Sequence, residues 1–369
     1  MGNLRICSKC IMDTTDPDIT FDEKGVCNYC RGFPLLKKKH IIDGKEGEAK
    51  LSSIIKEIKG KGKGKEYDCL IGLSGGVDST YVAYLVKKWG LKPLAIHLDN
   101  GWDSELSVSN IQRIVEKLNI DLYTYVLDWE EFKDLQLAYF KASVVNLEVP
   151  TDHAIPASLY NTASKMGIKY IIIGGNTSSE SLMPKKWTSN ANDLANLKDI
   201  HKRYGKLELK NYPTLGLFKI LYYWYIKKLK PIPVLNYMDY KKFKAKGLIM
   251  KELGWKDYGV KHGESTFTKF YQAYILPKKF NIDKRKAHLS NLIQSGQITR
   301  EEALNEVKKD VYTKEELEKE KRYVLKKFDI TETEFQRLMN LPNRDHSEFK
   351  SEQRILEFFK VIRSIFGNR

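Results

Sequence analysis

A glycine-rich loop between a strand and a helix constrains this chain most. The segment LSGGVDS at residues 73–79 follows a buried-type strand, 67–73, and leads into a helix, 77–89. Glycines let a backbone approach an anion closely, and the free N–H groups at a helix N-terminus attract phosphate. The hydroxyls of Ser74 and Ser79 add donors. The loop therefore predicts a phosphate-binding turn. The simpler interpretation is a glycine-rich strand–helix turn with a capping serine.

The acidic residue in this loop is unusual for a phosphate cradle. Asp78 is better explained if Mg²⁺ accompanies the anion, because Mg²⁺ binds carboxylates together with phosphate oxygens. The loop lacks the GxxxxGK[ST] pattern, so it is not a Walker A motif.

An alternating pattern of strands and helices surrounds the loop. Strands are predicted at 67–73, 92–98, 122–127 and 170–173, with helix-length segments between them. This order favours an α/β fold with a doubly wound parallel sheet. After about residue 180 the strand pattern stops and helices are expected to follow, one of them at 215–229. Four parts are predicted: a cysteine module (1–35), a linker or helix (36–66) with a flexible lysine–glycine tether at 59–65, the α/β domain (67–205), and a helical region (206–369) that binds the acceptor or a partner.

Four of the five cysteines form two CxxC pairs, Cys7 with Cys10 and Cys27 with Cys30. Two such turns can complete a tetrahedral site of four thiolates, which suits a structural Zn²⁺ ion. An iron–sulfur cluster is the alternative. Cys69 lies inside a predicted strand and is interpreted as a small buried residue. With no apolar signal segment and no apolar run of about 20 residues, a reducing, cytoplasmic location without a membrane span is expected.

The positive charge is concentrated in one part of the chain. The net charge is +16, and residues 201–300 alone carry 22 basic and 6 acidic residues. Such a block indicates a face for an anionic partner. A sugar diphosphate, an acidic protein, a membrane surface and RNA all stay open.

The loop at 74–79 resembles the PP-loop of ATP pyrophosphatases, also called adenine nucleotide alpha-hydrolases. The resemblance implies a PP-loop/HUP-like fold that holds the pyrophosphate of ATP while an oxygen is adenylylated and a nucleophile then displaces AMP. Residues after two further strands, at the edge where α/β sheets bind ligands, are expected to join the loop. The expected ATP-binding residues are Ser74, Gly75, Gly76, Asp78, Ser79, Asp99, Asn100, Gly174, Gly175 and Asn176.

Longer segments resemble the N-acetyl sugar amidotransferase family of the WbpG and PseA type. They are CSKCIMDTT at 7–15, PTDHAI at 150–155, KHGESTFTKFYQ at 261–272, DKRK at 283–286 and QITREEA at 297–303. The resemblance implies that ATP and ammonia convert an acetamido group of a nucleotide-linked sugar into an acetamidino group, in lipopolysaccharide or flagellin glycan synthesis. It also implies a partner glutaminase with a barrel-like synthase subunit, similar to the histidine-pathway pair, and an ammonia channel.

The same resemblance implies roles for charged residues. Asp78, Lys261 and Glu264 are expected to be catalytic. The residues expected to contact substrate are Asp152, His153, Glu180, His262, Lys284 and Arg285. Simpler interpretations stay open: Asp152 and Glu264 as helix caps, Glu180 as an exposed loop carboxylate or a Mg²⁺ ligand, and residues 284–286 as a solvated helix face.

Two other functions compete with sugar amidation. A tRNA-thiolating PP-loop enzyme would suit the basic block. Thiolation needs a sulfur-carrying thiol, however, and only Cys69 is left once four cysteines hold a metal. An RNA-binding module without catalysis would not explain the intact PP-loop. Nucleic acid is therefore not the expected partner.

Overall fold

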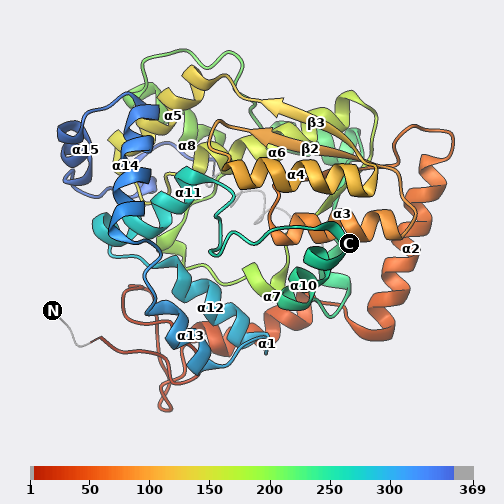
Figure 1. Ribbon diagram of the computed structural model, residues 1–369, viewed down its shortest axis with the longest axis horizontal. Coiled ribbons are helices and arrows are strands. Elements are labelled where there is room, and N and C mark those ends of the chain that lie inside the picture. Colours follow the sequence, from red (N-terminus) through yellow and green to blue (C-terminus); the bar gives the residue numbers. More distant parts are fainter. Residues whose placement is uncertain (1–3, 353–369) are drawn as a thin grey trace, which may run out of the picture.

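The computed structural model describes residues 4–352 and is built around one parallel sheet (Figure 1). Its strands are β1 (Cys69–Gly72), β2 (Pro93–Asp99), β3 (Asp121–Val126), β4 (Tyr170–Ile173) and β5 (Lys230–Pro233). They lie in the order β3-β2-β1-β4-β5, and every neighbouring pair is parallel. The predicted α/β fold with a doubly wound parallel sheet is confirmed.

Helices precede, connect and follow these strands. The α-helices are α1 (Asn28–His40), α2 (Gly44–Gly62), α3 (Val77–Lys88), α4 (Glu105–Leu118), α5 (Trp129–Ala142), α6 (Val149–Lys165), α7 (Thr177–Glu180), α8 (Leu194–Tyr204), α9 (Leu217–Leu221), α10 (Lys242–Leu253), α11 (Thr266–Phe270), α12 (Lys284–Gln294), α13 (Arg300–Val307), α14 (Lys314–Phe328) and α15 (Glu332–Met339). Shorter or wider turns are η1 (Lys185–Trp187), η2 (Tyr222–Ile226), η3 (Val234–Tyr237), η4 (Tyr271–Phe280) and η5 (His346–Glu348).

The central strands β1, β2 and β4 are buried on both faces, as their apolar residues require, while the edge strands β3 and β5 are more exposed. On one face Cys69 and Ile71 of β1 pack with α3, α4 and α10. On the other face Leu70 packs with α6 and with residues of 215–229. Successive residues of a strand point to opposite faces, which is why Leu70 lies in a different cluster from Cys69 and Ile71. Cys69 is a fully buried core residue, as predicted.

The prediction that strands end after about residue 180 is wrong. Residues 230–233, KPIP, form β5 at the edge of the sheet beside β4. Proline is tolerated on an edge strand because one side of that strand needs no ladder hydrogen bond. The predicted helix 215–229 is shorter than expected, since α9 passes into the π-helical turn η2 and the chain turns at Lys228 with φ +58°.

The lysine–glycine stretch at 59–65, predicted as a flexible tether, is helical as far as Gly62. Gly62 packs directly on Asp68, and a Cβ atom there would lie 2.2 Å from the Asp68 Cβ. The glycine therefore permits a close contact between α2 and the start of β1.

A second core joins parts of the chain that are far apart in sequence. Buried residues of the cysteine module, α5, α8 and the helices after residue 265 form one cluster, with Trp102 and Phe270 among its largest members. In Figure 1, α11, α14 and α15 lie on the side of the molecule away from α2. No helix within residues 4–352 is both long and apolar enough to cross a membrane.

Candidate functional site

The PP-loop is fixed at the carboxyl end of β1 by its glycines. Gly75 has φ +77°, a conformation that favours glycine, and its carbonyl oxygen accepts hydrogen bonds from Trp255 Nε1 at 2.7 Å and Tyr258 OH at 3.0 Å. Gly76 is the N-cap of α3. The hydroxyls of Ser74 and Ser79 lie 3.1 Å apart. The loop thus presents backbone and hydroxyl groups at a helix N-terminus, as an anion site requires.

The loop after β4 lies against the PP-loop. A Cβ atom on Gly174 would lie 3.1 Å from the Asp78 carbonyl carbon, so a side chain there would push the two loops apart by a few tenths of an ångström, whereas the space beside Gly175 is open. Asn176 caps α7 by accepting a hydrogen bond from the Ser179 N–H at 2.9 Å. These three residues therefore shape the loop, and Asn176 does so with its side-chain oxygen.

The end of β2 also uses its polar side chains locally. Asp99 Oδ1 accepts a hydrogen bond from the Gly101 N–H at 2.8 Å. Asn100 accepts from the Trp102 N–H and donates from Nδ2 to Thr151 Oγ1 at 3.1 Å. Asn100 thereby ties the carboxyl edge of the sheet to the first turn of α6.

Asp78 is the centre of a group of charged side chains beside the PP-loop. Tyr240 OH donates a hydrogen bond to its Oδ1 atom, and Lys242 Nζ lies 3.7 Å from Oδ2. Burial raises the pKa of Asp78, and the nearby Glu180 carboxylate raises it further, while the Lys242 charge opposes this shift. Asp78 is therefore held by a hydroxyl and a cation at the start of α3.

Lys261 extends this group toward α12. Its Nζ atom donates a hydrogen bond to His288 Nδ1 at 3.0 Å and lies 3.6 Å from Glu180 Oε1. Burial lowers the pKa of Lys261, and the carboxylates of Glu180 and Asp78 oppose this shift. Burial also lowers the pKa of His288 well below its usual value. The ring is therefore neutral, and its Nδ1 atom accepts the hydrogen bond from Lys261.

Glu264 completes the group on the other side of the loop. Its Oε1 atom lies 3.5 Å from His262 Nδ1, and a Cβ atom on Gly76 would lie 3.6 Å from the same oxygen. Burial opposes ionisation of Glu264, but hydrogen bonding and charge from His262 outweigh burial and lower its pKa. The three residues predicted to be catalytic, Asp78, Lys261 and Glu264, are thus brought together at the PP-loop.

The predicted substrate contacts divide into two sets. Glu180 and His262 join the group beside the PP-loop, while Asp152 and Lys284 form a neighbouring set described below. His153 does not reach either set. It is fully buried, its Nδ1 hydrogen-bonds the Ala191 carbonyl at 2.7 Å, and its Nε2 accepts from the Leu215 N–H at 3.0 Å.

Arg285 also lies apart from the site. Its guanidinium pairs with both carboxylate oxygens of Asp283 and donates to the Lys309 carbonyl oxygen at 2.7 Å. The predicted diphosphate contact therefore has no support at Arg285, whereas its neighbour Lys284 points inward and is 7% exposed.

Several residues of the site carried no sequence signal. They are Tyr240, Lys242, Trp255, Tyr258 and His288. All of them follow β5 and reach the PP-loop only because the chain returns to the sheet there. The excess of basic residues at 201–300 was the one sequence feature that indicated an anion site in this region, because it includes Lys242 and Lys261.

His97 connects the end of β2 to the PP-loop. Its Nδ1 lies 3.1 Å from the Leu73 carbonyl oxygen, and its Nε2 lies 2.9 Å from Asp103 Oδ2. Both partners accept hydrogen bonds, so this geometry suits a ring that is protonated on both nitrogens. Burial opposes that charged form, but the hydrogen bond and charge of Asp103 outweigh it and raise the pKa of His97.

We expect the stabilisation from the His97–Asp103 pair to depend on pH. A raised folded-state pKa gives stability that is complete below the unfolded value, about 6.5, and that is lost as pH rises through the folded value. His97→Gln should therefore lower the free energy of unfolding by about 2 kcal/mol at pH 6 and by less at pH 9. Urea unfolding at both pH values measures this, with exposed His40→Gln as control. An equal loss at both pH values contradicts the charged pair.

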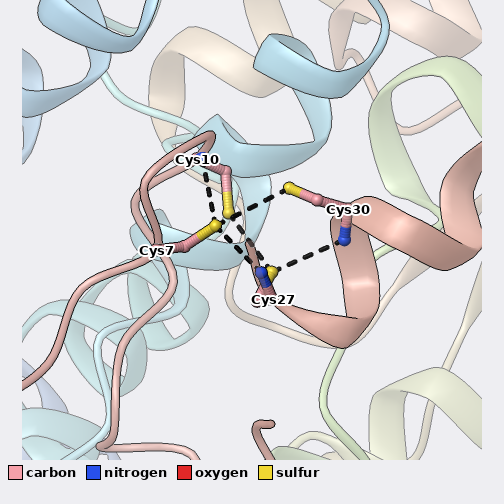
Figure 2. Close-up of side chains that lie close together, drawn as sticks. All are labelled: Cys7, Cys10, Cys27 and Cys30. Atoms are coloured by element: carbon pink, nitrogen blue, oxygen red, sulfur yellow. Dashed lines mark hydrogen bonds between the residues drawn. The ribbon is translucent and has the colours of Figure 1, made fainter. Parts of the chain in front are cut away.

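The four predicted metal ligands also converge. Their sulfur atoms all lie within 4.8 Å of one another, and Figure 2 shows them turned toward a common centre. The Sγ atoms of Cys10 and Cys27 are 3.7 Å apart, and those of Cys7 and Cys30 are 4.0 Å apart. Zn–S bonds of about 2.3 Å in a tetrahedron place sulfurs about 3.8 Å apart.

The surroundings of these sulfurs suit thiolates. Backbone N–H groups of Lys9 and Cys27 donate to Cys7 Sγ at 3.3 and 3.2 Å. Hydrogen bonds from Cys27 and Cys30 lower the pKa of Cys10, while the same contacts raise the pKa of Cys27 and Cys30, as expected for thiols that share protons. The spacing fits one metal ion rather than a multi-iron cluster, whose iron atoms would separate the sulfurs. The donor set therefore fits a structural Zn²⁺ ion.

Two family models match the chain. Residues 264–363 match the family described as LPS biosynthesis protein WbpG-like, C-terminal domain. Residues 50–214, which include the PP-loop and β1 to β4, match the family NAD synthase. The chain is a WbpG-type member of the PP-loop superfamily.

Curated relatives match less than a third of this WbpG-type chain. The tRNA-specific 2-thiouridylase MnmA 2 of Fusobacterium nucleatum is 27% identical over 118 residues, which cover 30% of this chain and 34% of that protein. The tRNA(Ile)-lysidine synthase of Chlamydia pneumoniae is 33% identical over 70 residues, which cover 18% of this chain and 22% of that protein. The chain thus spans about a third or less of the length of these relatives.

Among solved structures, the NH3-dependent NAD synthetase from Campylobacter jejuni is similar to the WbpG-type chain. It is 18% identical, with a TM-score of 0.31, and the match covers 73% of this chain and 99% of that one.

Proposed function

We propose that this WbpG-type enzyme uses ATP and ammonia to convert an acetamido group of a nucleotide-linked sugar into an acetamidino group. The observation that carries the proposal is the position of the loop at 261–264. Glu264 lies beside Gly76 of the PP-loop, and Lys261 lies between Glu180 and His288. This segment, which resembles the amidotransferase family, would thereby form one wall of the proposed nucleotide site and could hold an acceptor against ATP.

The proposed reaction needs mainly positioning and charge stabilisation. The amide oxygen attacks the α-phosphate of ATP, pyrophosphate leaves, and ammonia then displaces AMP. The N-terminus of α3 and the hydroxyls of Ser74 and Ser79 would hold the departing pyrophosphate. Lys242 and Lys261 would add positive charge there, and they account for part of the basic block.

Both proposed metals have suitable donors. Asp78 and Glu180 are the carboxylates beside the PP-loop, and Mg²⁺ commonly uses one or two carboxylates with substrate phosphates. When bound, Mg²⁺ would neutralise charge on the phosphates. Zn²⁺ at the four cysteines leaves no open coordination position and would serve folding alone.

Ammonia would come from a separate glutaminase with a barrel-like synthase subunit, in the cytoplasm and in a surface-glycan pathway. One face supports docking of such a partner. Phe218, Tyr225 and Ile226, from α9 and η2, are 63–71% exposed and lie close together in sequence. Exposed apolar side chains in a group are typical of an interaction surface.

The proposal is tested by ammonia rescue. Purified enzyme with ATP, Mg²⁺ and ammonium chloride is expected to lower the mass of an acetamido sugar nucleotide by about one unit, as oxygen is replaced by NH, and to release AMP and pyrophosphate. Mass spectrometry measures the product. An unchanged sugar nucleotide contradicts the proposal. Sulfur incorporation into tRNA would instead support thiolation. The state of Cys69 argues against thiolation, because this thiol is fully buried and burial raises its pKa.

A further inference from the structure

Two carboxylates lie on one side of α6 at its beginning. Glu148 is the N-cap residue and Asp152 follows four positions later, so the two side chains are one helical turn apart. Glu148 is 5% exposed. Thr268 Oγ1 donates a hydrogen bond to Glu148 Oε2 at 2.7 Å, but Oε1 has no hydrogen-bond partner in the part of the chain that the structure describes.

One lysine faces this pair. Lys284 begins α12, is 7% exposed, and has its Nζ atom 5.4 Å from the centre of the Tyr271 ring. Burial lowers the pKa of Lys284, while the charges of Asp152 and Glu148 oppose this shift. His262 also faces Asp152. Because His262 also acts on Glu264, the carboxylates of Glu148, Asp152 and Glu264 together face Lys284 and His262, which leaves a negative charge for one further cation.

Glu148 is costly to bury, whereas Asp152 one helical turn later is exposed. An ionised carboxylate without a full set of hydrogen bonds destabilises a protein interior. Burial, with the neighbouring Asp152 charge, raises the pKa of Glu148 to about 8, so the residue keeps its proton near neutral pH unless a cation is present. A buried titratable group of this kind indicates a function.

The pair lies next to the proposed nucleotide site. Asn100, at the carboxyl end of β2, donates to Thr151 Oγ1, which stands directly before Asp152. On the other side, the charge of His262 acts on Asp152, and His262 Nδ1 lies 3.5 Å from Oε1 of Glu264, which lies beside Gly76. A small molecule held here would therefore be close to an acceptor bound at the PP-loop.

We infer that Glu148 and Asp152 bind an ammonium ion and that Glu148 removes its proton. This inference rests on the proposed function, because an ammonia-consuming reaction gives the site its use. Ammonium would donate hydrogen bonds to Glu148 Oε1 and to Asp152 while Lys284 neutralises the second carboxylate. An N–H bond of ammonium then breaks, the proton binds Glu148, and the nitrogen lone pair is free to attack the imidate carbon.

The donor set favours ammonium over a metal ion. Mg²⁺ or Ca²⁺ would need several bound waters beside the two carboxylates and the Thr268 hydroxyl, and Glu148, which is 5% exposed, leaves little access for them. Because binding requires ionised Glu148, ammonium should bind more tightly above pH 8 than below it.

Thermal unfolding of the whole protein in ammonium chloride tests the site without ATP or sugar. At pH 8.5 and equal ionic strength, the unfolding midpoint should rise more with ammonium chloride than with potassium chloride. Glu148→Gln, which mimics the protonated residue, should remove this difference, and exposed Glu208→Gln should keep it. An equal rise with potassium, or no rise, overturns the inference.

Kinetics separate this inference from the proposed function. In the amidine-forming assay Glu148→Gln and Asp152→Asn should each raise KM for ammonium about tenfold and leave KM for ATP unchanged. A change in KM for ATP instead overturns the ammonium assignment. If wild-type enzyme forms no amidine but still shows the ammonium-specific shift, the proposed function fails and the cation site stands.

Discussion

Replacing Cys10 with serine is expected to release the metal and unfold the cysteine module. Within residues 4–27, the segment before α1 has only two isolated antiparallel bridges, Ile6 with Asp13 and Phe21 with Cys27, so we expect its fold to depend on the metal. Loss of a structural metal belongs to the most damaging classes of substitution, and we expect the free energy of unfolding to fall by more than about 4 kcal/mol. Metal analysis should find one zinc per wild-type chain and none in the variant, and urea unfolding measures the loss.

The damage should extend to the nucleotide site. Arg300 donates to the carbonyl oxygens of Cys10 and Cys7 at 3.0 and 3.1 Å, and Lys286 pairs with Asp13. These contacts attach the module to α12 and α13. Since α12 also carries Lys284 and His288, ATP turnover should fall together with the metal content.

Cys69→Ser is the matched control for this experiment. Cys69 is as buried as the four ligands but lies in β1, outside the metal group, so this variant should keep one zinc per chain. Full zinc content and unchanged stability in Cys10→Ser would contradict a four-thiolate structural site. A visible iron chromophore in the wild type would favour the iron–sulfur alternative.

The sequence was sufficient for β1, β2 and β4 because each is a short apolar run between turn signals, whereas the largely exposed β3 followed from the alternating order of strands and helices. Burial on both faces makes such runs continuous, as in the fully buried Leu70 and Ile71 of β1. The PP-loop and the CxxC pairs could be recognised in the sequence because their chemistry is local and depends on residues a few positions apart. Contacts within one turn leave a pattern in sequence.

The fifth strand and much of the site could not be predicted in this way. β5 contains Pro231 and Pro233, which are compatible with pairing only because the strand lies at the sheet edge, and edge position is a property of the whole fold. Tyr240 reaches Asp78 across 162 residues, and Trp255 reaches Gly75 across 180. No spacing rule joins residues so far apart.

His153 shows the opposite error. It was expected at the site because it belongs to the WbpG-like segment at 150–155, but the helical turn of α6 directs it away from Asp152 and into the core. Neighbours on a helix differ in direction by about 100°, so adjacent residues of a shared segment can have unrelated roles.

Gly75→Ala is expected to reduce ATP turnover about a hundredfold or more, because it displaces the PP-loop. Two effects combine at this position. The φ of +77° disfavours any residue with a Cβ atom, and that atom would lie 2.9 Å from Tyr258 OH and 3.1 Å from Ser107 Oγ. Since Tyr258 also donates to the Gly75 carbonyl, relief of the clash breaks a bond that fixes the loop. Pyrophosphate release from ATP in the amidine-forming assay measures the loss.

Gly167→Ala separates conformational strain from damage to the site. Gly167 has φ +66° but no atom within 4 Å of the added Cβ, and it lies between α6 and β4, away from the PP-loop. The two variants should therefore share a stability loss of about 1 kcal/mol from the positive φ, while only Gly75→Ala loses turnover. Equal turnover in both would mean that the loop backbone does not hold the pyrophosphate. Adding Tyr258→Phe to Gly75→Ala should restore part of the turnover, because it removes the closest contact and leaves the Trp255 bond to the same carbonyl in place.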